Sequence, residues 1–182
     1  MFVVVNQKTN CWGIGLNPLC IMTHALLLSF NTGIVGGSFW THSGAAVNYL
    51  CLTKQPEYDD VTKPIYVAYL YGSEYEEIGE LDDNDVPCSV CRVPQSSTIM
   101  VPGTLTCPSG WTTQYKGHLA AGHPYHYAAS EYVCLDGRPE GRPNSIQNQN
   151  GKLFYHAVGQ CGSLPCLPYI SEKVVTCVVC SK

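Results

Sequence analysis

The sequence is poor in charge and contains no long apolar run. Only 13% of its 182 residues are charged, about half the usual share, and residues 1–53 contain a single charged residue, Lys8. The formal net charge of −4 argues against a general affinity for nucleic acid, which is bound through basic surfaces. No run of 18 apolar residues occurs, so we expect no membrane span.

Several functional motifs are also missing. The 17 glycines show no Gly-X-Y period, so no collagen triple helix lies within the chain. There is no P-loop and no dinucleotide fingerprint, no nucleophile elbow around Ser43, and no Asn-x-Ser/Thr sequon for N-glycosylation. We therefore expect a non-enzymatic protein that needs no cofactor.

Cysteine, in contrast, is abundant. Eleven cysteines in a chain with 17 Gly and 12 Pro indicate an oxidising compartment, and hence a secreted, disulfide-bonded protein. Two Cys-x-x-Cys pairs, Cys88/Cys91 and Cys177/Cys180, would also suit zinc, but the 85 residues between them far exceed the usual 15 to 20 of a four-thiolate site. Structural disulfides are the favoured interpretation, with zinc and redox chemistry as alternatives.

The first segment, residues 1–33, differs from the rest of the chain. The apolar stretch 20–30 has the length of a signal-peptide core, but no basic cluster precedes it. Three interpretations remain open: a divergent signal or anchor, a buried strand or helix, and a truncated or faulty start.

The remaining chain contains an internal repeat. Residues 45–52 match 128–135 at an offset of 83 with five of eight positions identical, and 86–91 match 175–180 at an offset of 89. Between these matches, 71–73 align with 161–163. The preserved order predicts a tandem duplication of two small disulfide-stapled β-sheet subdomains, at about 34–97 and 98–182.

Each half is expected to be all-β. Residues 65–71 and 152–158 are rich in β-branched and aromatic side chains, which suit a half-buried pleated surface. Asn150-Gly151 is a hairpin turn signal before the second of these segments. Residues 98–101 and 173–179 are predicted as further strands, and no helical period of useful length appears outside the first segment.

The cysteines and their neighbours resemble a known family. The segments that carry the resemblance are 106–111, 115–117, 132–135, 161–166, 169–170 and 177–180. They are similar, in this order, to one half of the C-terminal non-collagenous domain of type IV collagen, which is itself a tandem duplication. Residues 36–46 and the ending 174–182 resemble most closely the spongin-like short-chain collagens of invertebrates, so the resemblance covers about 36–182.

The resemblance implies a disulfide pattern. It would join Cys107 to Cys180, Cys134 to Cys177, Cys161 to Cys166 and, in the first half, Cys51 to Cys88. Cys91 would then need a counterpart of Cys107, and the aligned position holds His24. Cys20 or Cys11 could take its place.

The resemblance also implies a function in the extracellular matrix. Such a module would assemble with copies of itself, as an oligomer or filament, or with other matrix proteins. The alternative is a lectin-like module, since exposed aromatic rings stack on sugars. Trp40, Tyr125 and Tyr127 are the candidate glycan contacts, with the polar segment 148–150 beside them.

Two further groups of residues invite a ligand. Ten of the fourteen acidic residues lie in 57–85, where a solvated acidic loop and calcium binding are both possible; the excess of basic residues in 86–182 would favour head-to-tail association. His118, His123 and His126 could hold a metal or pack within an aromatic loop. His42 aligns near His126 across the repeat, which favours packing.

Overall fold

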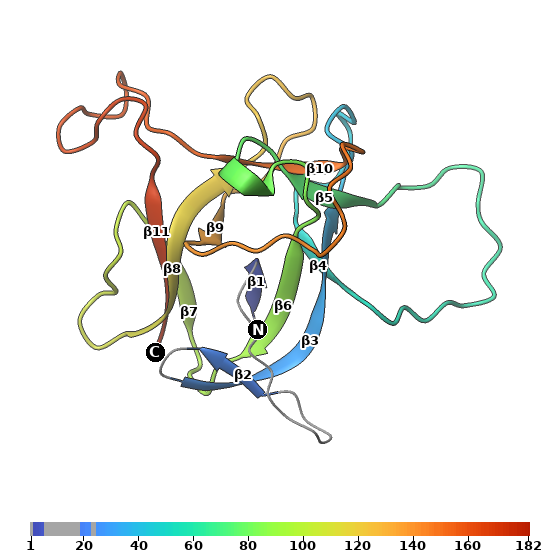
Figure 1. Cartoon of the computed structure of the whole chain (residues 1–182), viewed down its shortest axis with the longest axis horizontal. Helices are drawn as coiled ribbons and strands as arrows, with labels where there is room; N and C mark the ends of the chain where they lie inside the picture. The colour runs from blue at the N-terminus through green and yellow to red at the C-terminus, as the bar shows by residue number, and fades with distance from the viewer. Residues whose placement is uncertain (1, 6–18, 23–24) are drawn as a thin grey trace.

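Short strands separated by turns and loops make up the regular structure, as the β-branched and aromatic segments predict. A computed structural model describes residues 2–5, 19–22 and 25–182 (Figure 1). The strands are β1 Phe2–Val5, β2 Leu19–Met22, β3 Ala25–Gly37, β4 Leu50–Thr53, β5 Tyr71–Tyr75, β6 Pro87–Arg92, β7 Thr98–Pro102, β8 Thr112–Ala121, β9 Val133–Asp136, β10 Lys152–His156 and β11 Thr176–Ser181. One 3-10 turn, η1, spans Gly79–Leu81. The all-β prediction is confirmed, and no helix within the described residues is long and apolar enough to cross a membrane.

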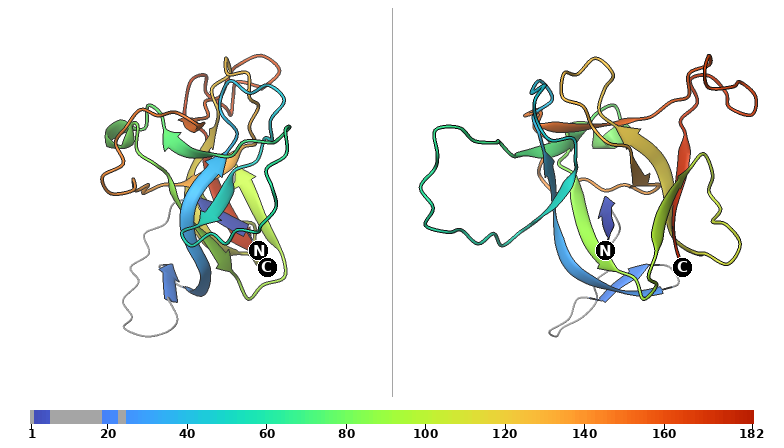
Figure 2. Two further views of the ribbon diagram at one scale, coloured as in Figure 1. Left: turned by 90° about the vertical axis from the view of Figure 1, so that its right-hand side faces the viewer. Right: turned by 180° about the vertical axis from the view of Figure 1, so that it is seen from behind.

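The eleven strands belong to one curled sheet. Its order is β10-β5-β3-β6-β1-β9-β8-β11-β7, with β2 and β4 also paired to β3. Because β10 pairs with both β5 and β8, the path from β5 round to β8 returns to β10 (Figures 1 and 2). The curl gives the sheet an inner face, where a core can be enclosed.

The long strands β3 and β8 each organise one half of the molecule. In the first half, β3 pairs with β4, β5 and β6. In the second half, β8 pairs with β9, β10 and β11 in the same arrangement. The residues in matching registers are Gly36 and Ala120, Leu50 and Val133, Gly72 and His156, Gly33 and Gly117, and Cys88 and Cys177.

One glycine in each half is required by a close approach of the backbone. A Cβ at Gly33 would overlap the carbonyl oxygen of Leu52, and a Cβ at Gly117 would overlap the carbonyl oxygen of Leu135. Only glycine leaves room for a neighbouring backbone at such positions. The strand that follows, β4 or β9, therefore lies against its partner in the same way in both halves.

Two parallel strand pairs join the halves. β10 pairs with β5, with Lys152 opposite Ser73, and β1 pairs with β9, with Val5 opposite Leu135. β1 also pairs with β6 on the side away from β3. In the same way, β7 pairs with β11 on the side away from β8. The first half is thus completed by a strand from the segment 1–33.

The main core cluster contains side chains from both halves. Its buried members are Val35, Tyr49, Tyr75, Ile78, Val86, Cys88, Ala120, Leu135 and Phe154. The rings of Tyr49 and Phe154 stack with centroids 4.2 Å apart. Burying an aromatic side chain of this size contributes roughly 1.5–3 kcal/mol, so separating the halves would lose the stabilisation from this contact.

One predicted strand is wrong. Residues 65–70 form no strand and belong to the 54–70 loop, and only Tyr71 of the predicted segment lies in β5. β-propensity reflects packing on a pleated surface, and this loop pairs with no strand among the described residues. The predicted strands at 98–101, 152–158 and 173–179 form with shifted ends, as β7, β10 and β11.

Two finer predictions from the sequence also need correction. Asn150-Gly151 has positive φ angles, 62° and 134°, but no strand runs through 137–149, so the turn closes no hairpin. The match of 71–73 with 161–163 is wrong, because strand register makes Tyr71 equivalent to Tyr155: they lie opposite Gly37 and Ala121. The apolar stretch 20–30 is strand wherever the structure describes it.

Candidate functional site

Four disulfides hold the sheet. They join Cys51 to Cys88, Cys107 to Cys180, Cys134 to Cys177 and Cys161 to Cys166, the four pairs that the resemblance implies. Neither Cys-x-x-Cys pair can offer two thiolates, so the zinc alternative is wrong. Three of the bonds close loops of 37, 43 and 73 residues, which corresponds to about 4 kcal/mol each in the chain-entropy account.

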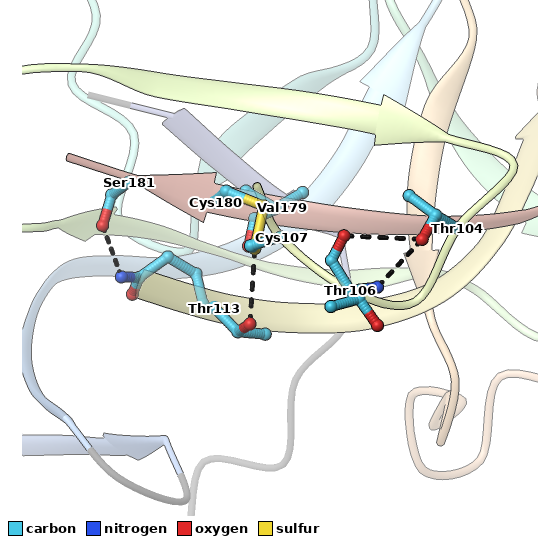
Figure 3. The surroundings of a disulfide bond; sticks show 8 residues. Thr104, Thr106, Cys107, Thr113, Val179, Cys180 and Ser181 are labelled. Carbon is cyan, nitrogen blue, oxygen red and sulfur yellow. Dashed lines mark hydrogen bonds between the residues drawn. A yellow bond between two sulfur atoms is a disulfide. The ribbon is translucent and has the colours of Figure 1, made fainter. Parts of the chain in front are cut away.

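The Cys107–Cys180 bond fastens the end of the chain to the rest of the second half (Figure 3). The Thr113 hydroxyl donates to the Cys107 sulfur at 3.3 Å. On the neighbouring position of β8, the Gln114 amide donates to the Ser181 hydroxyl at 2.6 Å. These side chains tie β8 to β11 beside the disulfide.

A second core cluster lies mainly in the second half; its buried members are Cys91, Val93, Tyr115, Leu119, Cys134, Cys177 and Val179. Cys91 belongs to it although its strand, β6, is part of the first half. It is fully buried with Tyr115, Cys134 and Cys177 among its neighbours. Burial raises the pKa of the Tyr115 phenol, whose hydroxyl donates to the Cys134 carbonyl at 2.9 Å. A bond from Cys91 to Cys11 or Cys20 stays a prediction, since Cys11 lies outside the described residues.

An aromatic–histidine cluster occupies the junction between the halves. We define it as Trp40, His123, Tyr125, His126 and Tyr155. The Trp40 ring lies 4.7 Å from that of His126, and His123 lies 5.1 Å from Tyr155 and 5.3 Å from Tyr125. Trp40 comes from the loop after β3 and the histidines from the loop after β8. Residues at least 83 positions apart in the sequence therefore meet here.

Backbone hydrogen bonds fix this cluster. The Trp40 amide donates to Gly151 and its carbonyl accepts from Ala128, both at 2.9 Å. Trp40 is half-buried, whereas Tyr125 is 86% exposed. The structure therefore brings two of the three predicted glycan contacts, Trp40 and Tyr125, into one cluster. Tyr127, the third, is 74% exposed and makes no ring contact with another described residue.

The pKa values of two residues in the cluster are shifted so that their rings are uncharged at neutral pH. Burial, and then the neighbouring His123, lower the pKa of His126, so its ring is uncharged at neutral pH. Burial, and then the Glu76 carboxylate, raise the pKa of Tyr155 to about 12. Uncharged rings at a partly open surface suit stacking on an apolar face of a ligand.

The same ring geometry recurs in the first half. The rings of His42 and Tyr71 are 5.6 Å apart with an interplanar angle of 71°, and those of His126 and Tyr155 are 5.7 Å apart with the same angle. The predicted alignment of His42 with His126 thus has a structural counterpart. His118, the third predicted histidine, instead contacts His156 at 5.2 Å.

Three carboxylates lie close together at the edge of the junction. Among the described residues, Glu74, Glu76 and Asp83 form the single group of three or more ligand side chains whose donor atoms all lie within 4.8 Å of one another. Oxygen donors of this kind suit hard cations such as Ca²⁺. Of the acidic stretch 57–85, only these three meet in this way; Glu57, Asp59 and Asp60 lie on the exposed loop.

The three carboxylates differ in their surroundings. Glu74 is buried and accepts hydrogen bonds from the amides of Gln149 and Asn150, at 3.1 and 2.8 Å. For Glu76, burial and then repulsion by Asp83 raise the pKa to about 7. Its Oε1 is buried without a hydrogen-bond partner among the described residues. This group therefore holds a proton more readily than an ordinary carboxyl.

A buried lysine bridges the halves. Lys152 donates to the Ala129 carbonyl at 2.9 Å and to the Ser38 hydroxyl at 3.4 Å. Its ammonium lies 5.1 Å from the ring centre of Tyr49, and burial lowers its pKa. The neighbouring Glu131 accepts from the Tyr49 amide at 3.0 Å, so the buried charge has a nearby counter-charge.

An open groove lies at the base of the 54–70 loop. It has a volume of about 570 Å³ and is lined by Gly37, Ser38, His42, Gly44, Ala45, Ala46, Asn48, Leu50, Val67, Ala68, Tyr69 and Leu70. Most of the lining is apolar and many of its side chains are small. Figure 1 shows the loop itself projecting from the sheet between β4 and β5.

No known protein-family model matches the chain.

Proposed function

We propose that the protein is a secreted, non-enzymatic structural module of the extracellular matrix, which assembles with copies of itself or with other matrix proteins. One observation carries this proposal: large apolar side chains are exposed on several loops. They include Tyr58, Ile65, Tyr66, Tyr125, Tyr127, Tyr132, Leu167 and Ile170. Tyr58, Ile65 and Tyr66 gather on one loop, and exposed apolar residues that gather in this way mark interaction surfaces, so a protein partner is the natural use of them.

The disulfides support the proposed location. Four disulfides in a chain of this size suit an oxidising, extracellular environment. The resemblance to non-collagenous domains of type IV collagen points to the same setting and to assembly.

We also infer that the chain is a tandem duplication. The two halves share strand registers, the close approach at Gly33 and Gly117, the His–Tyr ring geometry, and a disulfide from β4 to β6 that matches the one from β9 to β11. Independent origins would have to produce all of these features at matching positions.

Light scattering coupled to size-exclusion chromatography tests the assembly proposal. We expect the oxidised chain to self-associate as its concentration rises, with filaments or oligomers visible by electron microscopy. A monomer at every concentration would contradict self-assembly.

A second candidate function is glycan binding. The aromatic–histidine cluster favours it, because Trp40 and Tyr125 present uncharged rings at one partly open surface. A glycan array on wild type and Tyr125→Ala tests this alternative. Tyr125 is the better first variant, because Trp40→Ala would also remove contacts between the halves; Tyr132→Ala, at another exposed tyrosine, is the matched control. Equal binding of both variants and wild type would reject the cluster as a glycan site.

A further inference from the structure

The 54–70 loop is the most exposed apolar segment of the described chain. Ile65 and Tyr66 are 91% and 92% exposed, and Tyr58 is 90% exposed. Isolated exposed apolar residues are ordinary, but several on one projecting loop mark an interaction surface.

The backbone of this loop is also open. No backbone–backbone hydrogen bond joins residues 56–70 to any other described residue. Residues 65–71 have the composition of a strand, although the backbone bends at 65–66, and backbone without a partner is open to pairing with another chain. The loop therefore leaves backbone donors and acceptors without a backbone partner among the described residues.

The equivalent connection in the second half shows the contrast. Residues 137–151 run from β9 to β10 as 54–70 run from β4 to β5. Arg142 forms an ion pair with Asp85 at 3.1 Å, and the amides of Gln149 and Asn150 bind Glu74. That connection is fixed by contacts to the first half, whereas residues 56–70 make no backbone–backbone hydrogen bond to another described residue and expose large apolar side chains.

From these observations we infer that the 54–70 loop and the groove at its base bind the same surface of a second copy of the chain. This inference rests on the proposed self-assembly and names its contact. A twofold interface needs a patch that complements itself. The chain carries both parts on one face: projecting side chains at Tyr58, Ile65 and Tyr66, and an open groove lined by 37–50 and 67–70.

The charges of the loop complement themselves too. Lys63 and Asp59 are exposed and lie two residues either side of Val61. If two loops pair antiparallel about Val61, each Lys63 faces the partner's Asp59, and opposite charges at facing positions favour pairing.

The size of the surface suits a stable dimer. The 17 loop residues, with the eight further residues that line the groove, match the roughly 20–30 residues that one side of a standard interface uses.

Sedimentation of the oxidised full chain over a wide concentration range tests the contact. The first variant is Ile65→Ser with Tyr66→Ser, two side chains so exposed that folding does not need them. Its control is Leu105→Ser with Ile146→Ser, two exposed apolar residues on other loops. We expect the loop variant to raise the dimer dissociation constant at least 30-fold, as loss of an interface hot spot does, and the control to leave it within threefold.

A charge exchange provides the second measurement. Lys63→Glu should weaken the dimer, and Asp59→Lys with Lys63→Glu should restore it. If wild type self-associates and the loop variants associate equally well, the contact is wrong while self-assembly stands. If wild type stays monomeric at every concentration, the proposed self-assembly and this contact are both overturned.

Discussion

The two halves of the molecule share a strand arrangement but differ in one connection. It joins β4 to β5 in the first half and β9 to β10 in the second half. In the second half, residues 137–151 are polar and bind the first half through Arg142, Gln149 and Asn150. In the first half, residues 54–70 are exposed and combine large apolar side chains with five charged residues. The strands and their glycines are thus alike in the two halves, while the connections differ: one is fixed to the other half, and the other is exposed, which suits the partner surface that we propose.

The disulfides should give the largest stability difference. Replacing Cys134 and Cys177 by Ser is expected to lower the free energy of unfolding by about 4 kcal/mol, because the loop they close is long. Replacing Cys161 and Cys166 should cost about 2 kcal/mol at most, since that bond closes a short loop. Urea denaturation of the oxidised proteins measures both values. Equal losses would show that loop length does not govern these bonds.

The equivalent glycines sharpen the comparison of the halves. Gly33→Ala and Gly117→Ala should each destabilise the protein by about 3 kcal/mol, because the new Cβ meets a backbone carbonyl that cannot move freely. Gly44→Ala is the matched control, since a Cβ there meets nothing within 4 Å. A large loss at only one of the two glycines, seen by thermal and urea unfolding, would break the equivalence of the halves.

The two connections should respond differently to shortening. Replacing 57–66 by a short Gly/Ser linker is expected to change the free energy of unfolding of the monomer by less than about 1 kcal/mol. The same replacement of 139–148 should cost about 2 kcal/mol, because it removes the Arg142–Asp85 ion pair and leaves buried partners unsatisfied. Urea unfolding at low protein concentration compares them, and equal costs would contradict the division of roles.

The smallest expected effect is a pH dependence from Glu76. Its folded pKa of about 7 lies above the ordinary value of 4.5, so the folded protein holds the proton more tightly than the unfolded chain. Stability from this group is therefore present below pH 4.5 and is lost as the pH rises to about 7. Glu76→Gln should stabilise the protein above pH 7, by less than about 1 kcal/mol because the group is partly exposed.

The control for this effect is Glu77→Gln, at the exposed neighbouring position. Urea unfolding at pH 4 and pH 8 measures the difference. A gain for Glu76→Gln that is equal at both pH values would show that the proton on Glu76 is not its cause.

Local features of the fold were predictable from the sequence, and distant ones were not. Strand composition located β7, β10 and β11, and the family resemblance supplied the four disulfide pairs. The same composition misplaced a strand at 65–70, because propensity does not say whether a neighbouring strand exists. Equivalence of Tyr71 with Tyr155 was missed because it appears only in the strand register.

The candidate site was predictable only in part. Trp40 and Tyr125 were found as exposed-type aromatics, and His42 was aligned with His126. The contacts of Tyr155 with both histidines, and the meeting of Glu74 with Gln149 and Asn150, depend on parallel pairing of β5 with β10. Pairing between strands more than 70 residues apart leaves no periodic signal in the sequence, so no pattern could have located this cluster.

The parallel pairs between the halves impose an order on biosynthesis. β1 and β5 emerge from the ribosome early, but their partners β9 and β10 follow only after residues 133–136 and 152–156 have been made. Until then the nascent first half keeps two open strand edges, and such edges are sites of mispairing in slowly closing β proteins. Closure of the sheet therefore waits for β9 and β10, which are among the last strands to be made.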